Sequence, residues 1–424
     1  MTELKPHIPT KAICIPASEP IDVSEFLPLI DHSLFQRLRG RKQLGINHLV
    51  FPGAVHTRFE HALGVLGLTD RVCRMYDIAG ADRRLLCAYA LLHDIGHGPF
   101  SHQIEPILDG SHNEQGKLYI KDMGAELHKC RIDPDALLAM FEDEAPYKQI
   151  INDRNLGTDK LDYLRRDALH IGFTGTPEIE KVLRYSTPAE DGWKVEEKFI
   201  EDVKRIQKFY SYLHQHGYLN KTALSVQRVF QRAVQEALHH GVFSKDQLWR
   251  ATDLELEAAM QSGQSALTYR LMKSLHDRSF HRSAFVIKPK KYGFVERRSG
   301  KALVVHEWNR QMLRKAATRL SDCQTSRAWE NQLADRLGLE PGDILFAAMP
   351  FFDKLVPKDI RMFSACSGQS YWLFENDRDH YRSLQGDYLR TFAIRVITPR
   401  HNRRFVADSA DIIADFLANK LTDD

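Results

Sequence analysis

The chain has 424 residues, enough for two or three domains or for one large domain with an appended lobe. Hydrophobic residues make up 43% and charged residues 27%, which is an ordinary balance for a soluble globular protein. The 59 Lys and Arg residues nearly balance the 56 Asp and Glu residues, so the net charge of +3 gives no case for a protein that coats nucleic acid.

Neither the cysteines nor the hydropathy indicates an oxidising compartment or a membrane. None of the six cysteines forms a CxxC pair, which excludes a zinc ribbon and a thioredoxin-like motif. No stretch approaches the roughly 20 apolar residues that span a bilayer. Residues 1–16 lack the basic and apolar segments of a leader sequence. We therefore expect a cytoplasmic protein with no membrane partner.

Three helices are predicted before residue 180. In the segment Arg58–Tyr76, apolar residues recur at roughly helical spacing. The segment Leu85–Leu92 is apolar on all sides, which indicates a buried central helix that carries His93 and Asp94 at its end. The third helix is predicted over residues 158–170.

The pattern becomes more mixed after residue 180. A hairpin or lobe boundary is predicted at residues 186–196, because this segment contains a proline and an Asp-Gly turn signal. Long helices are expected from about residue 197 to residue 240. A further helix is expected to begin at Ser244, where Ser244 and Gln247 match a capping box.

From residue 282 onward, short strand-like runs are separated by basic turns, which predicts a smaller α+β lobe. The strand candidates are AFVIK (284–288), YGFVE (292–296), ALVVHEW (302–308), 343–348, 371–374 and 391–397. The helix candidates are 307–320, 327–337 and 407–421.

The residues that carry chemistry are concentrated in RFEH (58–61), HDIGHGPFSH (93–102) and DKLDYLRRD (159–167). Imidazole nitrogens and carboxylate oxygens are ligands for divalent metals. Four such groups, on three predicted helices, are His61, His93, Asp94 and Asp159. Inward-facing ligands on several helices are a known way to build a metal site in a helical core. Such a metal lowers the pKa of water and so generates a nucleophile.

Each of these groups has a simpler explanation when it is taken alone. His61 could be an ordinary interfacial histidine, and a His-Asp dipeptide is common in proteins. The string 93–102 differs, because it places four ionisable groups and two glycines at the end of an apolar helix. Glycines allow the backbone to turn tightly and to approach a ligand closely. We therefore favour a metal site over a purely structural role.

Four strings in this order resemble the HD phosphohydrolase superfamily, and in particular its dNTP triphosphohydrolase branch. They are FQRLRGRKQLG (35–45), FPGAVHTRFEHALGV (51–65), HDIGHGPFSH and DKLDYLRRD. The resemblance is dense over residues 25–170 and faint afterwards. It implies a divalent metal on His61, His93, Asp94 and Asp159, with Mn, Mg, Fe, Ni, Co and Zn all compatible with these ligands. It also implies a nucleotide substrate, with a dNTP hydrolysed to deoxynucleoside and tripolyphosphate.

The same resemblance implies catalytic roles beside the metal. His97 and His102 match histidines that contact phosphate and transfer protons, which suits a side chain that titrates near neutrality. Glu105 matches a carboxylate that orients a catalytic histidine. The family's next catalytic histidine directly precedes Glu-Gln-Gly, where this chain has Asn113, and His112 lies one residue early. Either a shift in the loop brings His112 into place, or proton transfer is altered.

Six side chains are implied in substrate binding. They are Gln43, Leu44, Arg58, Lys160, Tyr163 and Asp167. Arg58 and Lys160 match phosphate contacts, and Gln43 and Asp167 match groups that bind the sugar 3′-hydroxyl. Tyr163 lies one turn after the predicted ligand Asp159, so both can face one site. The alternatives are a solvated helix face for the cations, core packing for Leu44 and Tyr163, and a local ion pair for Asp167.

Two features keep other functions open. Near residues 209–232 the dNTPases have an aromatic-His-x-x-Arg pattern, and no arginine stands at that place here, although Arg228 or Arg232 could substitute. A nucleoside monophosphate or another phosphoester is therefore an alternative substrate. The basic runs KPKK (288–291), RRSGK (297–301) and RHNRR (400–404) raise a second alternative, a non-catalytic regulator that binds nucleotide or nucleic acid. Such runs are more often solvated turns.

The expected fold is mainly α, with an HD-domain helical body and a smaller α+β C-terminal lobe. We expect an N-terminal segment (1–30), an HD catalytic core (31–180), a helical extension that completes the active-site body (181–281) and the C-terminal lobe (282–424). By analogy with the family, a homo-oligomer, at least a dimer, is expected, and a regulatory nucleotide site at a subunit interface is an option.

Overall fold

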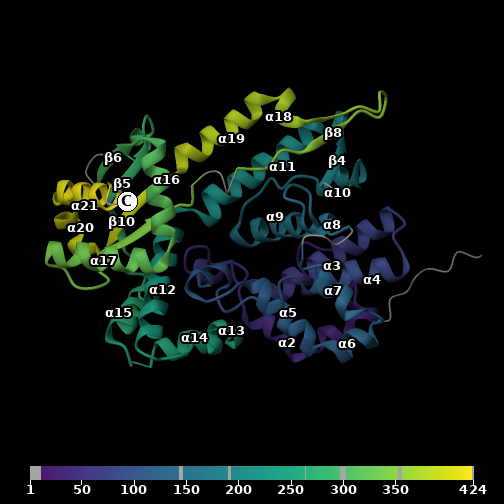
Figure 1. The fold of residues 1–424 in the computed structure, drawn as a ribbon, viewed down its shortest axis with the longest axis horizontal. Coiled ribbons are helices and arrows are strands. Elements are labelled where there is room, and N and C mark those ends of the chain that lie inside the picture. The colour runs from purple at the N-terminus through teal and green to yellow at the C-terminus, as the bar shows by residue number, and fades with distance from the viewer. Residues whose placement is uncertain are drawn as a thin grey trace, which may run out of the picture.

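The computed structural model describes residues 11–142, 147–189, 192–262, 264–296, 302–351 and 356–422. Within these ranges the chain is mainly helical and contains three small sheets (Figure 1). This confirms the predicted fold, a helical body with a smaller α+β lobe. In the described part of the chain, no helix has both the length and the apolar character needed to cross a membrane.

Three helices form the centre of the body. They are α3 (Arg58–Met75), α4 (Gly80–Leu92) and α9 (Thr158–Ile171), and α3 packs against the other two. The hydroxyl of Thr57 caps α3 by accepting from the Glu60 backbone N–H. Gly172 ends α9 in the left-handed conformation that favours glycine. The apolar end of α4 is fully buried, as its sequence predicts, so His93 and Asp94 lie deep in the molecule.

Shorter helices surround these three. They are α1 (Leu27–Ile30), α2 (Ser33–Gln36), α5 (His112–Asp122), α6 (Gly124–Lys129), α7 (Pro134–Ala139), α8 (Gln149–Asn152) and α10 (Ile179–Arg184). The segment predicted as long helices consists of α11 (Ile200–Leu213) and α12 (Lys221–His239), joined by a π-helical turn over His214–Tyr218. Single π turns of this kind are frequent at functional sites.

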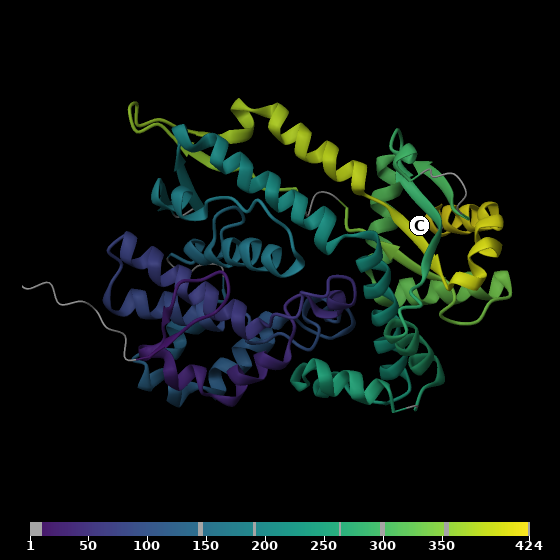
Figure 2. The same ribbon diagram turned by 180° about the vertical axis from the view of Figure 1, so that it is seen from behind.

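The helix α12 lies between the body and the C-terminal lobe, and α13 (Lys245–Arg250), α14 (Asp253–Met260) and α15 (Ala266–His276) follow it (Figure 2). The expected capping box is present, because the Ser244 hydroxyl accepts from Gln247 N–H and the Gln247 side chain accepts from Ser244 N–H.

The lobe contains a four-stranded sheet in the order β6-β5-β10-β7. These strands are β5 (Arg282–Pro289), β6 (Val304–Trp308), β7 (Leu345–Ala348) and β10 (Ile394–Thr398). Strand β6 pairs parallel with β5, and the other pairings are antiparallel. The lobe helices are α16 (Arg310–Ser321), α17 (Cys323–Leu337), α20 (Arg403–Asp408) and α21 (Ala410–Thr422). Two further helices, α18 (Leu373–Asn376) on the body and α19 (Arg378–Thr391), lead back toward the lobe.

A second sheet joins residues from distant parts of the sequence. The hairpin predicted at 186–196 forms β3 (Ser186–Ala189) and β4 (Gly192–Glu196), and its residues 190–191 lie outside the described part. Strand β8 (Arg361–Phe363) pairs parallel with β4, and β9 (Ser370–Trp372) extends the sheet beyond β8. The chain therefore returns from the lobe to the body (Figure 1). A third, two-stranded sheet joins β1 (Ala12–Ile13) to β2 (Ile21–Asp22).

Two strand predictions were wrong in detail. The run YGFVE contains a 3-10 turn over Gly293–Val295 rather than a strand, because the Glu307 carboxylate accepts the Lys291 and Gly293 backbone N–H groups. The candidate strand 371–374 ends at Trp372, and α18 begins at the next residue.

The buried side chains form two cores that meet near the end of α4. One core fills the helical body, and the other joins α12 to the lobe sheet. Phe100, from the HDIGHGPFSH string, belongs to the second core and packs on Phe230 of α12 with ring centroids 4.3 Å apart. The string therefore crosses from one core to the other.

Candidate active site

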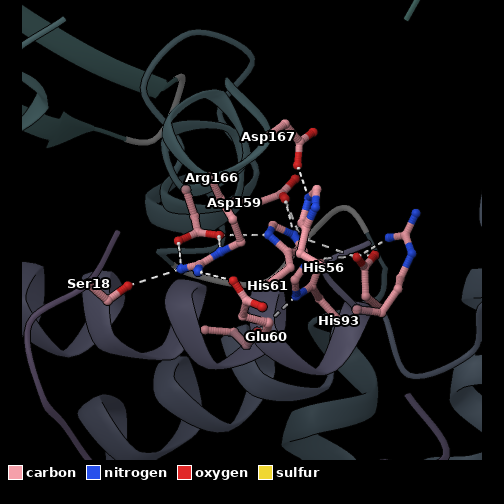
Figure 3. A network of polar contacts seen from close by, with 12 residues as sticks. Ser18, His56, Glu60, His61, His93, Asp159, Arg166 and Asp167 are labelled. Carbon is pink, nitrogen blue, oxygen red and sulfur yellow. Dashed lines mark hydrogen bonds and ion pairs between the residues drawn. The ribbon is translucent and has the colours of Figure 1, made fainter. Parts of the chain in front are cut away.

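The four predicted metal ligands converge at one point. His61 from α3, His93 after α4 and Asp159 from the first turn of α9 face one another (Figure 3). Asp94, which follows His93, lies close to both imidazoles. His61 Nε2 lies 3.1 Å from Asp159 Oδ1 and 3.7 Å from Asp94 Oδ2. His93 Nε2 lies 3.6 Å and 3.5 Å from oxygens of the same two carboxylates. Ligand atoms of His61, His93 and Asp94 all lie within 4.8 Å of one another, which allows these three groups to share one ion. Asp159 lies against both imidazoles.

The Nδ1 atom of each of the two imidazoles already makes a hydrogen bond within the protein. His93 Nδ1 donates to the Ala90 carbonyl oxygen at 2.8 Å, and His61 Nδ1 donates to Asp162 Oδ2 at 2.8 Å. Since these oxygens accept, the proton resides on Nδ1 and Nε2 faces the carboxylates. Among the described residues, His93 Nε2 has no hydrogen-bond partner although it is buried. Two imidazoles oriented in this way, with two carboxylates, fit a divalent metal.

The charge at this point favours a cation. Burial by itself lowers the pKa of His61, but hydrogen bonds to Asp159 and Asp162 raise that pKa to about 10. Burial raises the pKa of Asp94, yet Arg58 and His93 hold it well below its usual range. The carboxylates that attract a proton to His61 also attract a metal ion, which would displace that proton.

The backbone after α4 turns in contact with α5. A Cβ at Gly96 would lie 1.9 Å from the His112 carbonyl oxygen and 2.4 Å from the Gly116 backbone nitrogen. At Gly98 the nearest atoms would be 3.6 Å away, which is ordinary contact. The tight approach at Gly96 therefore places the His97 turn directly against the first turn of α5.

We expect Gly96→Ala to lower turnover by about 100-fold or more, because α5 and the ligand-bearing turn must separate and a shift of about 1 Å misaligns the reacting groups. The matched control Gly98→Ala should stay within a few-fold of the wild type. Turnover at saturating substrate, with circular dichroism to check folding, measures both variants. Equal effects of the two substitutions would contradict this role of the close contact.

A histidine cluster lies beside the predicted metal ligands. The Glu105 carboxylate accepts from His102 Nδ1 at 2.9 Å and from His112 Nδ1 at 2.7 Å. Burial raises the pKa of Glu105, but these two hydrogen bonds lower it below its usual range. The His97 ring stacks on His112 with centroids 4.0 Å apart, and His97 Nε2 lies 3.3 Å from Asp94 Oδ1. The structure thus brings His112, not Asn113, to the carboxylate.

A cavity of about 660 Å³ opens onto both groups. Eleven of the fourteen predicted site residues line it. They are Gln43, Leu44, Arg58, His61, His93, Asp94, His102, His112, Asp159, Tyr163 and Asp167. Arg58 is 3% exposed and is held by Asp94 and by the Ser101 hydroxyl, which accepts from Nε at 2.8 Å.

Three predicted residues do not line this cavity. His97 is buried and lies against Asp94, and Glu105 accepts hydrogen bonds from His102 and His112, which do line the cavity. The Lys160 ammonium group donates to the Arg154 carbonyl oxygen and lies 3.4 Å from the centre of the Tyr210 ring. Burial lowers the pKa of Lys160 to about 7. It lines a neighbouring cavity that it shares with Asp159 and Tyr163.

Several site residues were not predicted from the sequence. Asp162 orients His61 and is itself held by Arg166. The one sequence pattern that pointed to Asp162 is its position one helical turn after Asp159. Asp167 accepts from His56 Nε2 at 2.7 Å and from the Tyr218 hydroxyl at 2.5 Å. No local pattern pointed to His56. Its role follows from tertiary contact alone.

The proposed substitutes for the missing arginine are not at the cavity. Arg228 Nε and Nη2 donate to the two Glu330 carboxylate oxygens at 2.8 and 2.7 Å. Arg232 donates to Glu330 and to Glu236. Both arginines are buried among α12 and α17, so the hypothesis that one of them substitutes for the missing arginine was wrong. The π turn instead places His214 and Tyr218 on the cavity wall.

Comparison with known proteins identifies the domain that these residues form. Residues 58–167 match the HD domain family, and this match includes all four converging ligands. The chain contains an HD domain. The predicted resemblance to the HD superfamily and to its dNTP triphosphohydrolase branch is confirmed.

The HD-domain chain is similar to several curated proteins. It is 30% identical over 276 residues to an uncharacterised protein of Methanocaldococcus jannaschii, a match that covers 63% of this chain and 59% of that protein. It is 32% identical to the uncharacterised protein YwfO of Bacillus subtilis, covering 49% and 52% of the two chains. It is 30% identical to the deoxynucleoside triphosphate triphosphohydrolase SAMHD1 of Bos taurus, covering 51% and 46%. The HD-domain chain thus spans about half the length of these relatives.

A solved structure shares the fold. The crystal structure of a phosphohydrolase from Bacteroides thetaiotaomicron superposes with a TM-score of 0.68 at 20% identity. The match covers 92% of this chain and all of that one, so the likeness includes the C-terminal lobe as well as the HD domain.

Proposed function

We propose that this HD-domain protein is a metal-dependent phosphohydrolase that acts on nucleotides. The observation that carries the proposal is the geometry of His61, His93, Asp94 and Asp159, whose imidazole Nε2 atoms and carboxylates face one point at the wall of a 660 Å³ cavity. A divalent metal bound there would act as a Lewis acid on a phosphoryl oxygen and would acidify water. Three costly buried polar groups, His61, His93 and Asp94, that face one point beside the half-buried Asp159 are typical of a functional site.

The histidine cluster supplies the proton chemistry. Because Nδ1 of His102 and of His112 donates to Glu105, the Nε2 atom of each ring is the one that can exchange a proton. His112 and His102 both line the cavity. Either could give a proton to the leaving 5′-oxygen when the bond from this oxygen to the α-phosphorus breaks. Arg58, which is held by Asp94 and Ser101, offers a positive charge for the phosphate.

For the substrate we propose a dNTP, hydrolysed by water to deoxynucleoside and tripolyphosphate. Gln43, Tyr163 and Asp167 also line the cavity, and their side chains suit the sugar. Gln43 Oε1 is buried with no partner among the described residues, so it can accept from a sugar hydroxyl. The similarity to SAMHD1 supports the same class of substrate.

A different phosphoester is the second candidate. Arg228 and Arg232 are bound to Glu330, so neither can bind the terminal phosphates of a triphosphate. A nucleoside monophosphate or a modified nucleotide needs fewer cations than a triphosphate. A non-catalytic regulator is the third candidate. The basic runs that suggested it, KPKK (288–291), RRSGK (297–301) and RHNRR (400–404), are distant in sequence from the HD motif. Of these runs, RRSGK lies outside the described residues.

One panel of reactions separates these candidates. We expect turnover of dNTPs with a 1:1 release of deoxynucleoside and tripolyphosphate, and loss of that turnover when a chelator removes the metal. The products should be identified by chromatography with dNTPs, NTPs and monophosphates as substrates and with each divalent metal in turn. Release of inorganic phosphate from a monophosphate alone would favour the second candidate. Binding of nucleotide or single strands without turnover would favour the third.

A further inference from the structure

A chain of buried hydrogen bonds leads from the predicted metal ligand His61, through Asp162, to Arg166. His61 Nδ1 donates to Asp162 Oδ2, and Arg166 Nε donates to the same oxygen at 2.9 Å. Arg166 Nη2 donates to the other oxygen of Asp162 at 2.8 Å. The side chains of Asp162 and Arg166 are both fully buried. A planar guanidinium that binds both oxygens of a carboxylate fixes its orientation, and with it the orientation of the imidazole that donates to this carboxylate.

The guanidinium group of Arg166 uses all five of its N–H donors. Two of them bind Asp162. Of the other three, those on Nη1 donate to Glu60 Oε1 at 3.0 Å and to the Pro16 carbonyl oxygen at 2.6 Å, and one on Nη2 donates to the Ser18 hydroxyl at 3.0 Å (Figure 3). The position of Arg166 is therefore determined by contacts with α9, with α3 and with the segment that precedes β2.

This segment belongs to an N-terminal hairpin, residues 12–22, which consists of β1, β2 and the turn between them. Ala17, within the turn, has a φ of +60°, a left-handed conformation that is uncommon outside glycine and persists where surrounding contacts hold it. Its two neighbours, Pro16 and Ser18, supply the carbonyl oxygen and the hydroxyl that accept from the guanidinium. Strand β2 packs against α3. The hairpin is thus held on α3 with two of its oxygens facing the guanidinium.

The lack of a side chain at Gly64 makes room for this arrangement. Gly64 lies on α3, one turn after His61. A Cβ at this position would lie 2.1 Å from Arg166 Nη2 and 2.2 Å from Asp162 Oδ1, which is closer than non-bonded atoms approach. The guanidinium and the carboxylate therefore pack directly on the backbone of α3 beside the imidazole. Such close packing limits the rotation of the Asp162 carboxylate away from the ring.

We infer that Arg166 is a positioning residue for the metal site, and that it makes the metal affinity of this site depend on the N-terminal hairpin. The inference rests on the metal site of the proposed function but not on the identity of the substrate. A metal-binding imidazole is oriented by the group that accepts from its other nitrogen, and loss of such a partner lowers metal affinity by about 10–100-fold. Here that partner, Asp162, is held by Arg166, and Arg166 is held in turn by two oxygens of the hairpin. A change in the hairpin therefore reaches His61 through successive hydrogen bonds.

The dissociation constants of the metal-free full chain for Mn²⁺ and for Zn²⁺, measured by competition with a fluorescent chelator, test this inference. Arg166→Lys should bind both ions about tenfold or more weakly, because lysine keeps the charge but loses the two-point contact with Asp162. Ser18→Ala should bind them about threefold more weakly, because one hydrogen bond to the guanidinium is lost. Arg165→Lys is the matched control and should bind like the wild type, since Arg165 precedes Arg166 on α9 but pairs with Glu180.

Urea unfolding of the same metal-free variants separates positioning from a purely structural ion pair. A structural ion pair would lower the free energy of unfolding and leave both dissociation constants unchanged, and that result for Arg166→Lys would overturn the inference. So would equal weakening in Arg165→Lys. Wild-type affinity in Ser18→Ala would overturn the dependence on the hairpin. Ser18 is partly exposed, so Ser18→Ala keeps the fold and carries the test if Arg166→Lys does not fold.

These measurements also distinguish the inference from the proposed function. No substrate is present, so a chain that hydrolysed no phosphoester would leave their outcome unaffected. Binding of Mn²⁺ or Zn²⁺ that is lost in His93→Ala but unchanged in Arg166→Lys and Ser18→Ala would overturn the inference alone. Absence of Mn²⁺ and Zn²⁺ binding in the wild type would refute the proposed metal site and the inference together.

Discussion

Replacing His93 by alanine, or Asp94 by asparagine, is expected to remove the bound metal and to lower turnover by at least about 1,000-fold. The loss follows because a catalytic metal contributes several kcal/mol to stabilising charge in the transition state. His93 and Asp94 each face the point at which His61 and Asp159 also meet. Metal content by mass spectrometry of the purified variants, together with single-turnover rates, measures both effects.

Asp94→Asn is preferred to alanine because Arg58 is buried and donates to the Asp94 carboxylate. An amide oxygen keeps an acceptor for Arg58, so any loss of activity is not simply unfolding. The control is His240→Ala, because His240 is exposed at the end of α12. Wild-type turnover in a His93→Ala/Asp94→Asn protein shown to be metal-free would refute the proposed metal site.

Glu330→Ala is expected to destabilise the chain by about 3–5 kcal/mol. Glu330 is 1% exposed and accepts from Arg228, from Arg232 and from the Phe346 backbone N–H of β7. Its removal leaves two buried guanidinium groups without their shared carboxylate. Such a loss costs far more than an exposed ion pair, because the charges that remain cannot be solvated.

Urea unfolding monitored by circular dichroism measures the change in the free energy of unfolding. Asp335→Ala is the matched control, because Asp335 lies on the same helix, α17, but is exposed, and we expect a change within about 0.5 kcal/mol. Glu330→Gln should fall between the two, since the amide keeps the acceptor oxygen but not the charge. A Glu330→Ala effect as small as that of Asp335→Ala would show that the two arginines find other partners.

The sequence by itself was sufficient for the local features. An all-apolar helix that ends in His93-Asp94 predicts buried polar groups at its end, and the structure has them there. The helices that carry His61 and Asp159 follow from periodicity and from the HD resemblance. In each case the signal lies within one or two helical turns, because amphipathic spacing and capping depend on near neighbours.

Only the tertiary structure decided which side chains contact one another. It showed that Asp162 holds His61, that Asp167 is held by His56 and Tyr218, and that Arg228 is bound to Glu330 instead of substrate. It also showed β8 returning to pair with β4. The residues that make each of these contacts are about 50 to 200 positions apart or have no distinctive spacing. The packing of the two cores decides which charged side chains lie next to one another. No local pattern in the chain encodes these pairings.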